Sequence, residues 1–394
     1  MPRVFCIILD GLGVGDLPDS MEFGDSGCNT LAHVAEAVGG LRLPALEGMG
    51  LGRIQPFKGM SDSAKVKGFH GRMAERSRGK DSTTGHWELA GLLTPKAFPL
   101  FPAGFPPELL ADLSERTGFE FIGNVAASGT EIIQRLGDEH LATGKLIVYT
   151  SADSVFQVAA HEDRMSLDEL YEFCETAREI LQGELGVSRV IARPFMGKPG
   201  VYERSDGRRD YSLPPPQATL LDRLLDGGVP VTGIGKVKDL FSGRGFSTHL
   251  VSHGNREGMA LFAGLLARRR PRAFNIINLV DFDMLWGHRN DPEGFAGGLV
   301  EFDRWLQQFL AGLETGDLLF LTADHGNDPT TPGTDHTREY VPILGWGPGM
   351  RSALDLGIRE SFADFAETVL DIFELAPMGT GKSFWREMKG AWNG

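Results

Sequence analysis

Short apolar runs rich in β-branched residues alternate along the chain with longer segments whose apolar residues recur at spacings of three and four. The first pattern predicts buried strands, and the second predicts helices with one apolar face. The clearest predicted strands are residues 4–9, 274–280 and 318–322. The clearest predicted helices are residues 29–38, 167–181, 294–313 and 361–373. This alternation is typical of an α/β fold with a largely parallel sheet between helices.

Two groups of prolines divide the chain, one at Pro95, Pro99 and Pro102 and the other at residues 214–216. The segment between them contains its own predicted elements, namely helices at 107–117, 129–136 and 167–181 and strands at 146–149 and 189–192. A chain of 394 residues exceeds the size at which one hydrophobic core usually stops growing. We therefore predict a core domain of residues 1–93 and 216–394 and an inserted smaller α/β domain of residues 94–215. The alternative is that these prolines lie in ordinary loops of one large domain.

The formal net charge of -14 disfavours a protein that binds nucleic acid, because such binding needs basic surface to displace counterions from phosphate. One basic cluster follows an apolar helical stretch at 258–267, and a solvated helix end is favoured over a binding patch there. The cluster consists of Arg268, Arg269, Arg270 and Arg272.

No apolar run approaches the roughly 20 residues that span a bilayer, and the run at 4–9 is too short for a signal peptide. A cytoplasmic protein that does not contact membranes is therefore expected. The three cysteines Cys6, Cys28 and Cys174 lie far apart in the sequence and form no CxxC pair. We expect them to be reduced and packed in the interior.

Three predicted strands run into aspartates, and histidines lie close by in the sequence. Because ligands in open α/β sheets bind at the carboxyl ends of strands, these side chains could converge on one place. The candidate metal ligands are Asp10, Asp283, His288, Asp324, His325 and His336. Three carboxylates and three imidazoles suit manganese, zinc or iron, and the set contains no thiolate to select a softer metal. Two divalent ions would exceed the carboxylate charge and leave room for a bridging alkoxide or phosphate oxygen.

Three hydroxyl groups, those of Ser82, Thr83 and Thr84, precede a stretch of helical character at 87–92. One of them could lie at a helix N-terminus, where backbone N–H groups favour phosphate. A hydroxyl in that place is a candidate nucleophile. The alternative is that Ser82 only caps the helix. Spacing alone does not choose among the three.

Four motifs resemble those of the phosphopentomutase family in the alkaline phosphatase superfamily, and the likeness runs through nearly the whole chain. They are GKDSTTGHWE at 79–88, VYTSADSV at 148–155, NLVDFDMLWGH at 278–288, and TADHGND at 322–328 with HTRE at 336–339. The resemblance implies an alkaline-phosphatase-like core with an inserted cap, two Mn2+ ions with Zn2+ or Fe2+ as alternatives, and a phosphorylated hydroxyl. It also implies interconversion of ribose 1-phosphate and ribose 5-phosphate, with their deoxyribose analogues, and activation by a sugar bisphosphate such as glucose 1,6-bisphosphate.

By position, the resemblance assigns three ligands to each ion: Asp283, His288 and His336 to one, and Asp10, Asp324 and His325 to the other. It assigns the nucleophile to the first residue after Lys-Asp, which is normally threonine in the family and is Ser82 here, with Thr83 as the alternative. Serine supplies the same oxygen without the methyl group. The positions that resemble the family's substrate contacts are Ser151, Asp153, Arg189 and Arg204 in the inserted segment and Lys236 in the core.

The resemblance therefore implies an isomerase that works through a phosphoenzyme and a pentose bisphosphate intermediate. The expected partners are pentose phosphates, and a monomer is expected. A metal-dependent phosphatase or phosphodiesterase is the alternative enzyme, because the same ligands and hydroxyl serve hydrolysis. A catalytically silent metal-binding protein is the alternative from another class.

Overall fold

The computed structural model describes residues 2–61, 65–151, 153–268 and 272–391. Its chain divides into two compact units, one formed by Met1–Ala97 with Pro215–Gly394 and the other by Phe98–Pro214. Arg269 and Arg270 of the predicted basic cluster lie outside the described residues. None of the helices within the described ranges is long and apolar enough to cross a membrane.

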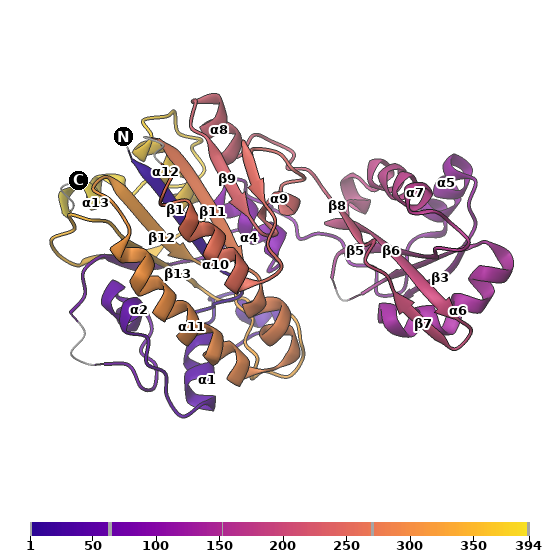
Figure 1. Ribbon diagram of the computed structural model, residues 1–394, viewed down its shortest axis with the longest axis horizontal. Helices are drawn as coiled ribbons and strands as arrows, with labels where there is room; N and C mark the ends of the chain where they lie inside the picture. The colour runs from indigo at the N-terminus through magenta and orange to yellow at the C-terminus, as the bar shows by residue number, and fades with distance from the viewer. Residues whose placement is uncertain (1, 62–64, 152, 269–271, 392–394) are drawn as a thin grey trace. The chain divides into compact units, whose positions relative to one another are not determined.

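The first unit is built on an eight-stranded sheet with the order β10-β9-β11-β1-β12-β13-β2-β14 (Figure 1). The strands are β1 (Arg3–Leu9), β2 (Phe69–Met73), β9 (Val231–Ile234), β10 (Thr248–Leu250), β11 (Ala273–Leu279), β12 (Asp317–Thr322), β13 (Val341–Trp346) and β14 (Leu354–Arg359). The run from β10 to β12 is parallel throughout, whereas β13 is antiparallel to both β12 and β2. The predicted α/β class with a largely parallel sheet is confirmed.

The three predicted strands at the centre of this sheet are present with shifts of one residue at their ends, and all their residues are buried. Both β1 and β12 begin on a charged residue that the apolar pattern left out. Arg3 Nε donates to Asp317 Oδ1 at 2.7 Å and Arg3 Nη2 donates to Asp317 Oδ2 at 2.6 Å. This paired geometry permits both charges to be buried inside the sheet.

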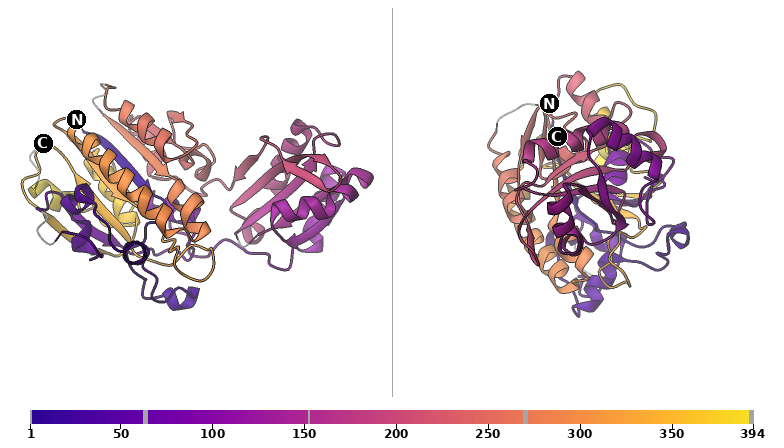
Figure 2. Two further views of the ribbon diagram at one scale, coloured as in Figure 1. Left: turned by 60° about the horizontal axis from the view of Figure 1, so that its bottom comes forward. Right: turned by 90° about the vertical axis from the view of Figure 1, so that its right-hand side faces the viewer.

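Helices cover both faces of the sheet. Successive side chains of a strand point to opposite faces, so contacts made by different strand residues identify the helices on each face. On one face Phe5 of β1 contacts Phe262 of α10 (Asn255–Gly264) and Phe309 of α11 (Pro292–Ala311), with ring centroids 5.7 and 5.6 Å apart. On the other face the ring centroid of Phe320 of β12 lies 5.4 Å from that of Phe365 of α12 (Ala363–Ile372). Figure 1 and the left view of Figure 2 show α11 running obliquely across the first of these faces.

The helices of the first unit are mostly short. They are α1 (Thr30–Ala37), α2 (Pro44–Met49), α3 (Leu51–Ile54), α4 (Ser82–Leu89), α8 (Leu220–Asp226), α9 (Val237–Leu240), α10 (Asn255–Gly264), α11 (Pro292–Ala311), α12 (Ala363–Ile372) and α13 (Trp385–Ala391). The predicted helix at 87–92 is wrong in its bounds, because α4 begins at Ser82 and ends at Leu89. Its first turn is polar and was therefore assigned to a loop.

The second unit has a sheet of its own with the order β3-β4-β5-β6-β7, and β8 pairs with β6. Its strands are β3 (Phe121–Ala126), β4 (Leu146–Thr150), β5 (Val155–His161), β6 (Arg189–Lys198), β7 (Val201–Arg204) and β8 (Arg209–Ser212). Helices α5 (Pro107–Thr117) and α7 (Leu167–Ile180) pack on one face and α6 (Gly129–Thr143) packs on the other (Figure 1). Strand β6 extends beyond the predicted 189–192 because its far half pairs with β7.

Candidate metal centre

The three central parallel strands deliver three carboxylates to one edge of the sheet. Asp10 directly follows β1, Asp324 lies two residues after β12, and Asp283 lies in a short turn, Phe282–Trp286, after β11. All three are buried. An isolated buried carboxylate is costly, so three in one place require positive charge between them.

The first group of possible ligands contains Asp10, Asp324 and His325, whose ligand atoms lie within 4.8 Å of one another. His325 Nε2 lies 3.4 Å from Asp10 Oδ1 and 3.4 Å from Asp324 Oδ2. Asp10 Oδ1 and Asp324 Oδ2 are buried without a hydrogen-bond partner among the described residues, and Asp10 Oδ2 forms an ion pair with Lys236. A divalent cation would satisfy these oxygens, so the donor set fits a metal ion.

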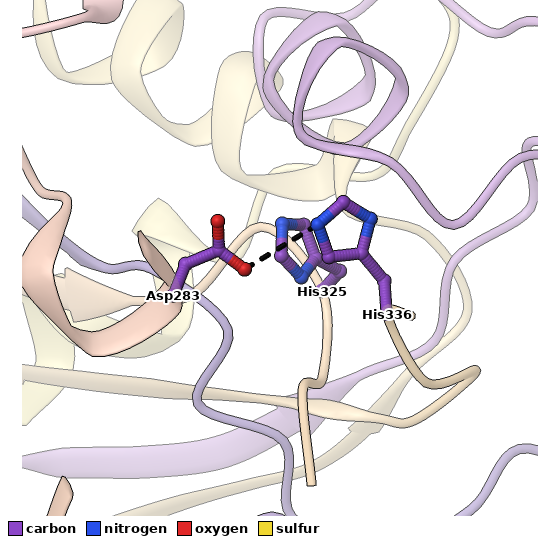
Figure 3. Close-up of side chains that lie close together, drawn as sticks. All are labelled: Asp283, His325 and His336. Carbon is purple, nitrogen blue, oxygen red and sulfur yellow. Dashed lines mark ion pairs between the residues drawn. The ribbon is translucent and has the colours of Figure 1, made fainter. Parts of the chain in front are cut away.

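The second group contains Asp283, His325 and His336, which meet the same limit of 4.8 Å. Figure 3 shows the Asp283 carboxylate directed at the His336 ring, with the His325 ring beside it, and Asp283 Oδ1 lies 3.3 Å from His336 Nε2. His288 reaches the same carboxylate, because its Nε2 lies 3.3 Å from Asp283 Oδ2. The Nδ1 atom of His288 lies 2.5 Å from the carbonyl oxygen of Thr334, a contact that orients the ring as in many histidine metal ligands.

The structure thus brings all six predicted ligands together, and it adds one feature that the sequence did not indicate. His325 lies within reach of both groups, so the two candidate sites are immediate neighbours. The centroids of the His325 and His336 rings are 4.0 Å apart. Asn327 was also missed, although it lies beside the Asp324-His325 motif, and its Nδ2 donates to Asp283 Oδ1 at 2.7 Å.

Ser82 is the first residue of α4 and its hydroxyl faces the metal centre. Ser82 Oγ lies 3.1 Å from His325 Nε2 and accepts a hydrogen bond from Lys236 Nζ at 2.9 Å. The cap of this helix is Asp81, whose carboxylate accepts from the backbone N–H of Thr84 at 3.0 Å. The alternative that Ser82 only caps the helix is therefore wrong.

The other two hydroxyls of the motif point elsewhere. The Thr84 hydroxyl donates to Asp81 Oδ2 at 2.6 Å, which commits it to the cap. Thr83 is buried, and no contact with a candidate ligand is seen for it among the described residues. The geometry favours Ser82 among the three.

Comparison with known proteins decides the family. The model of the metalloenzyme superfamily matches residues 2–377. The phosphopentomutase of Desulfitobacterium hafniense is 51% identical over 388 residues, which cover 98% of this chain and 100% of the relative. The phosphopentomutase of Syntrophotalea carbinolica is 53% identical over 383 residues, with 97% of each chain covered. The chain belongs to the phosphopentomutase family. The resemblance found in its motifs is confirmed.

Among solved structures, phosphoglycerate mutase of Leishmania mexicana covers 96% of this chain and 97% of its own, at 13% identity and a TM-score of 0.47.

The ionisable groups at the metal centre of this phosphopentomutase-family chain shift one another's pKa. Burial and the neighbouring Asp324 raise the pKa of Asp10. Burial acts the same way on Asp283, but His336 and His288 outweigh it and hold the pKa of that carboxyl well below its usual range. Burial disfavours the charged form of His325, yet Asp324, Asp10 and Asp283 outweigh burial and raise the pKa of His325 to about 10. The pocket therefore favours cations.

Lys236 adds a positive charge at the same place. It directly precedes α9, forms an ion pair with Asp10, and contacts Ser82 as described. Burial lowers the pKa of Lys236, but the three carboxylates Asp10, Asp283 and Asp324 outweigh it and raise that pKa. The ammonium group is thus held beside the candidate nucleophile as a permanent cation.

The four remaining positions that resemble the substrate contacts of phosphopentomutases lie in the second unit. Arg189 Nη2 lies 3.9 Å from Asp153 Oδ2, and Arg189 Nη1 lies 3.5 Å from Asp210 Oδ2. Ser151 directly follows β4. Arg204 ends β7, and its guanidinium lies next to Gly129, at the start of α6. Within this unit the structure pairs Asp153 with Arg189.

Proposed function

We propose that this chain is an isomerase that interconverts (deoxy)ribose 1-phosphate and (deoxy)ribose 5-phosphate at a site with two divalent ions. The full-length similarity to phosphopentomutases supports this substrate class. The observation that carries the proposal is the placement of the Ser82 hydroxyl at 3.1 Å from His325, the one residue that both candidate ligand groups share. A nucleophile there would lie beside the residues that would hold the two ions.

Asp10, Asp324 and His325 would hold one ion, and Asp283, His288 and His336 would hold the other. Manganese is the proposed metal, and zinc and iron have the same ligand preferences. When bound, the ions neutralise charge on the oxygens that gain and lose the phosphoryl group in an in-line transfer.

Ser82 is the residue that would carry the phosphoryl group. In the active form, the bond between Ser82 Oγ and phosphorus breaks as a pentose phosphate hydroxyl forms its own bond to that phosphorus. The pentose hydroxyl loses its proton and Ser82 Oγ regains one. The pentose bisphosphate then turns, and Ser82 takes the other phosphoryl group in the reverse of this step. Lys236 Nζ, 2.9 Å from Ser82 Oγ, stabilises the negative oxygen in each direction.

The residues that would bind the substrate are Ser151, Asp153, Arg189, Arg204 and Lys236. Arginine binds phosphate through paired N–H donors, and carboxylate and hydroxyl groups suit the sugar hydroxyls. The boundaries 94–215 stay a prediction from the two proline groups, and the role of this segment as a cap is what the family resemblance implies. A cap would exclude water while Ser82 is phosphorylated.

The test is intact-mass measurement after incubation with glucose 1,6-bisphosphate and Mn2+. The wild-type chain should gain one phosphoryl group, Ser82→Ala should gain none, and Ser82→Thr should regain it. Thr83→Val is the matched control and should behave as wild type. If wild type never gains the group, or Ser82→Ala gains it equally well, the assignment is wrong.

The same samples separate a mutase from a hydrolase. Conversion of ribose 1-phosphate to ribose 5-phosphate in a coupled assay, without release of inorganic phosphate, is the expected result. Phosphate release at the rate of sugar phosphate consumption would instead show a phosphatase. Metal binding without either turnover would show a silent metal-binding protein.

A further inference from the structure

Helix α4 carries a buried histidine that has no assigned task. His86 is 1% exposed and lies one turn after Ser82. Its Nδ1 atom lies 2.8 Å from the backbone carbonyl oxygen of Ser82 and 3.1 Å from Asp324 Oδ2. The Nδ1 atom therefore lies between the backbone of the residue that carries the candidate nucleophile and the carboxylate of a candidate metal ligand.

The opposite side of the ring determines which nitrogen carries the proton. His86 Nε2 lies 3.3 Å from Nδ2 of Asn278, a buried residue of β11. An amide nitrogen can only donate, so Nε2 accepts and Nδ1 holds the proton. The Nδ1–H group then donates to Ser82 and lies within contact distance of Asp324, both of which offer oxygens. Asn278 thus fixes the orientation of the ring.

Two residues of α4, Gly85 and Glu88, hold the helix in the position that the His86 contacts require. A Cβ atom on Gly85 would lie only 1.9 Å from the carbonyl oxygen of Asp324, so the helix packs directly against the backbone of that residue. Glu88 anchors the other end, because its carboxylate accepts from the backbone N–H of Ser77 at 2.6 Å and from the Ser361 hydroxyl at 2.7 Å. The position of His86 is therefore set by packing on both sides.

Donor groups contact both oxygens of the Asp324 carboxylate. The backbone N–H of Gly11 donates to Asp324 Oδ1 at 3.2 Å, and His86 lies beside Oδ2. Donors of this kind orient a carboxylate toward a metal ion without removing its charge. These donors also limit the rotation of the Asp324 side chain. Less side-chain entropy is therefore lost when the ion binds.

We infer that His86 is a positioning residue that holds the Asp324 carboxylate and the Ser82 backbone in one arrangement, so that metal binding and the nucleophile are coupled. The inference rests on the proposed function for the role of Ser82. The effect of His86 on metal affinity can be measured independently of that role. Loss of such an orienting partner typically weakens metal affinity by about 10- to 100-fold.

The experiment compares His86→Leu, His86→Asn and His86→Gln in the full chain by Mn2+ titration. His86→Leu should bind Mn2+ about 10- to 100-fold more weakly than wild type. His86→Asn can place an amide nitrogen near the position of Nδ1 and should recover part of the affinity, whereas His86→Gln should not. His70→Asn, a change at another buried histidine in the same unit, should leave Mn2+ binding unchanged.

Steady-state kinetics and intact mass complete the test. His86→Leu should lower kcat and slow phosphorylation of Ser82 at saturating Mn2+, with little change in KM. Asn278→Leu, which leaves His86 in place, should shift Mn2+ affinity in the same direction and keeps the test open if His86→Leu fails to fold. Wild-type Mn2+ affinity and kcat in folded His86→Leu would overturn the inference. Absence of phosphorylation in wild type would instead overturn the proposed function.

Discussion

Arg338 shows at the scale of single residues how the metal centre and the nucleophile loop are connected. It lies two residues after His336 and is 2% exposed. Its Nη1 atom donates to Glu75 Oε2 and to the carbonyl oxygen of Gly79, each at 2.7 Å, and its Nη2 atom donates to Asp19 at 3.0 Å. One guanidinium therefore joins the ligand segment to the loop that leads into Ser82.

Replacing this arginine should be strongly destabilising. We expect Arg338→Met to lower the free energy of unfolding by about 3–5 kcal/mol, because Glu75 and Asp19 would be left without their buried cation. Urea denaturation measures the change. Arg256→Met is the control, since this arginine and its partner Glu301 lie at the surface and the free energy of unfolding should stay nearly unchanged. Wild-type stability in Arg338→Met would contradict the expectation.

At the scale of secondary-structure elements, the N-terminus of α4 places the candidate nucleophile. Asp81 caps this helix through the backbone N–H and the hydroxyl of Thr84. Asp81→Ala should cost about 1 kcal/mol of stability, as is typical for a lost cap, and should reduce phosphorylation of Ser82 because the first turn frays. Intact mass and urea denaturation measure the two effects.

The matched control for that variant is the cap of α7 in the other unit. Ser166 accepts from the backbone N–H of Glu169 at 3.3 Å and is part of a capping box. Ser166→Ala should cost a similar free energy and leave phosphorylation unchanged. Equal losses of phosphorylation in both variants would show that the effect comes from stability alone.

A buried histidine in α6 should make the stability of the folded chain sensitive to acid. His140 of α6 is fully buried; its Nδ1 atom lies 2.7 Å from the carbonyl oxygen of Lys145, and its Nε2 atom accepts from the backbone N–H of His161 at 2.9 Å. Burial lowers the pKa of His140, and the nearby His161 and Arg164 act in the same direction. The folded chain therefore resists the proton that the unfolded chain accepts below a pH of about 6.5.

This difference in pKa determines how the free energy of unfolding changes with pH. The contribution of His140 to stability should be complete above a pH of about 6.5 and should fall as the pH drops from there toward the lowered pKa of the folded state. The free energy of unfolding, measured at pH 8 and pH 5.5, should decrease less in His140→Gln than in wild type. His253→Gln, at an exposed position, should keep the wild-type decrease. Identical decreases in all three proteins would contradict the prediction.

At the scale of the whole molecule, the buried carboxylates make the stability of the first unit depend on cations. We expect Mn2+ at about 100 times its Kd to add about 2.7 kcal/mol to the free energy of unfolding, and a chelator to remove that gain. Asp10→Asn should abolish most of the Mn2+ effect. Asp303→Asn is the control, because Asp303 is a buried carboxylate of α11 that accepts from backbone N–H groups and lies outside the candidate ligands.

Most elements of the fold could be predicted from the sequence because their signals are local. The apolar runs of β1, β11 and β12 and the periodic pattern of α11 are properties of neighbouring residues, and burial follows from them. The element ends were less accurate. Arg3 and Asp317 join the sheet only because they pair with each other, and they are 314 residues apart in the chain.

Five of the candidate ligands were identifiable from sequence because they follow or lie near the carboxyl ends of parallel strands, which meet at one edge of the sheet, whereas His336 was identified by its motif. The resemblance grouped these ligands by position, whereas the tertiary structure places His325 within reach of both groups and Ser82 against His325. The contacts of His86 with Asp324 and of Arg338 with Gly79 likewise join segments far apart in the chain. Periodicity and motif spacing describe only short stretches, so contacts of this kind have no signal in a single sequence and arise only when the chain is packed.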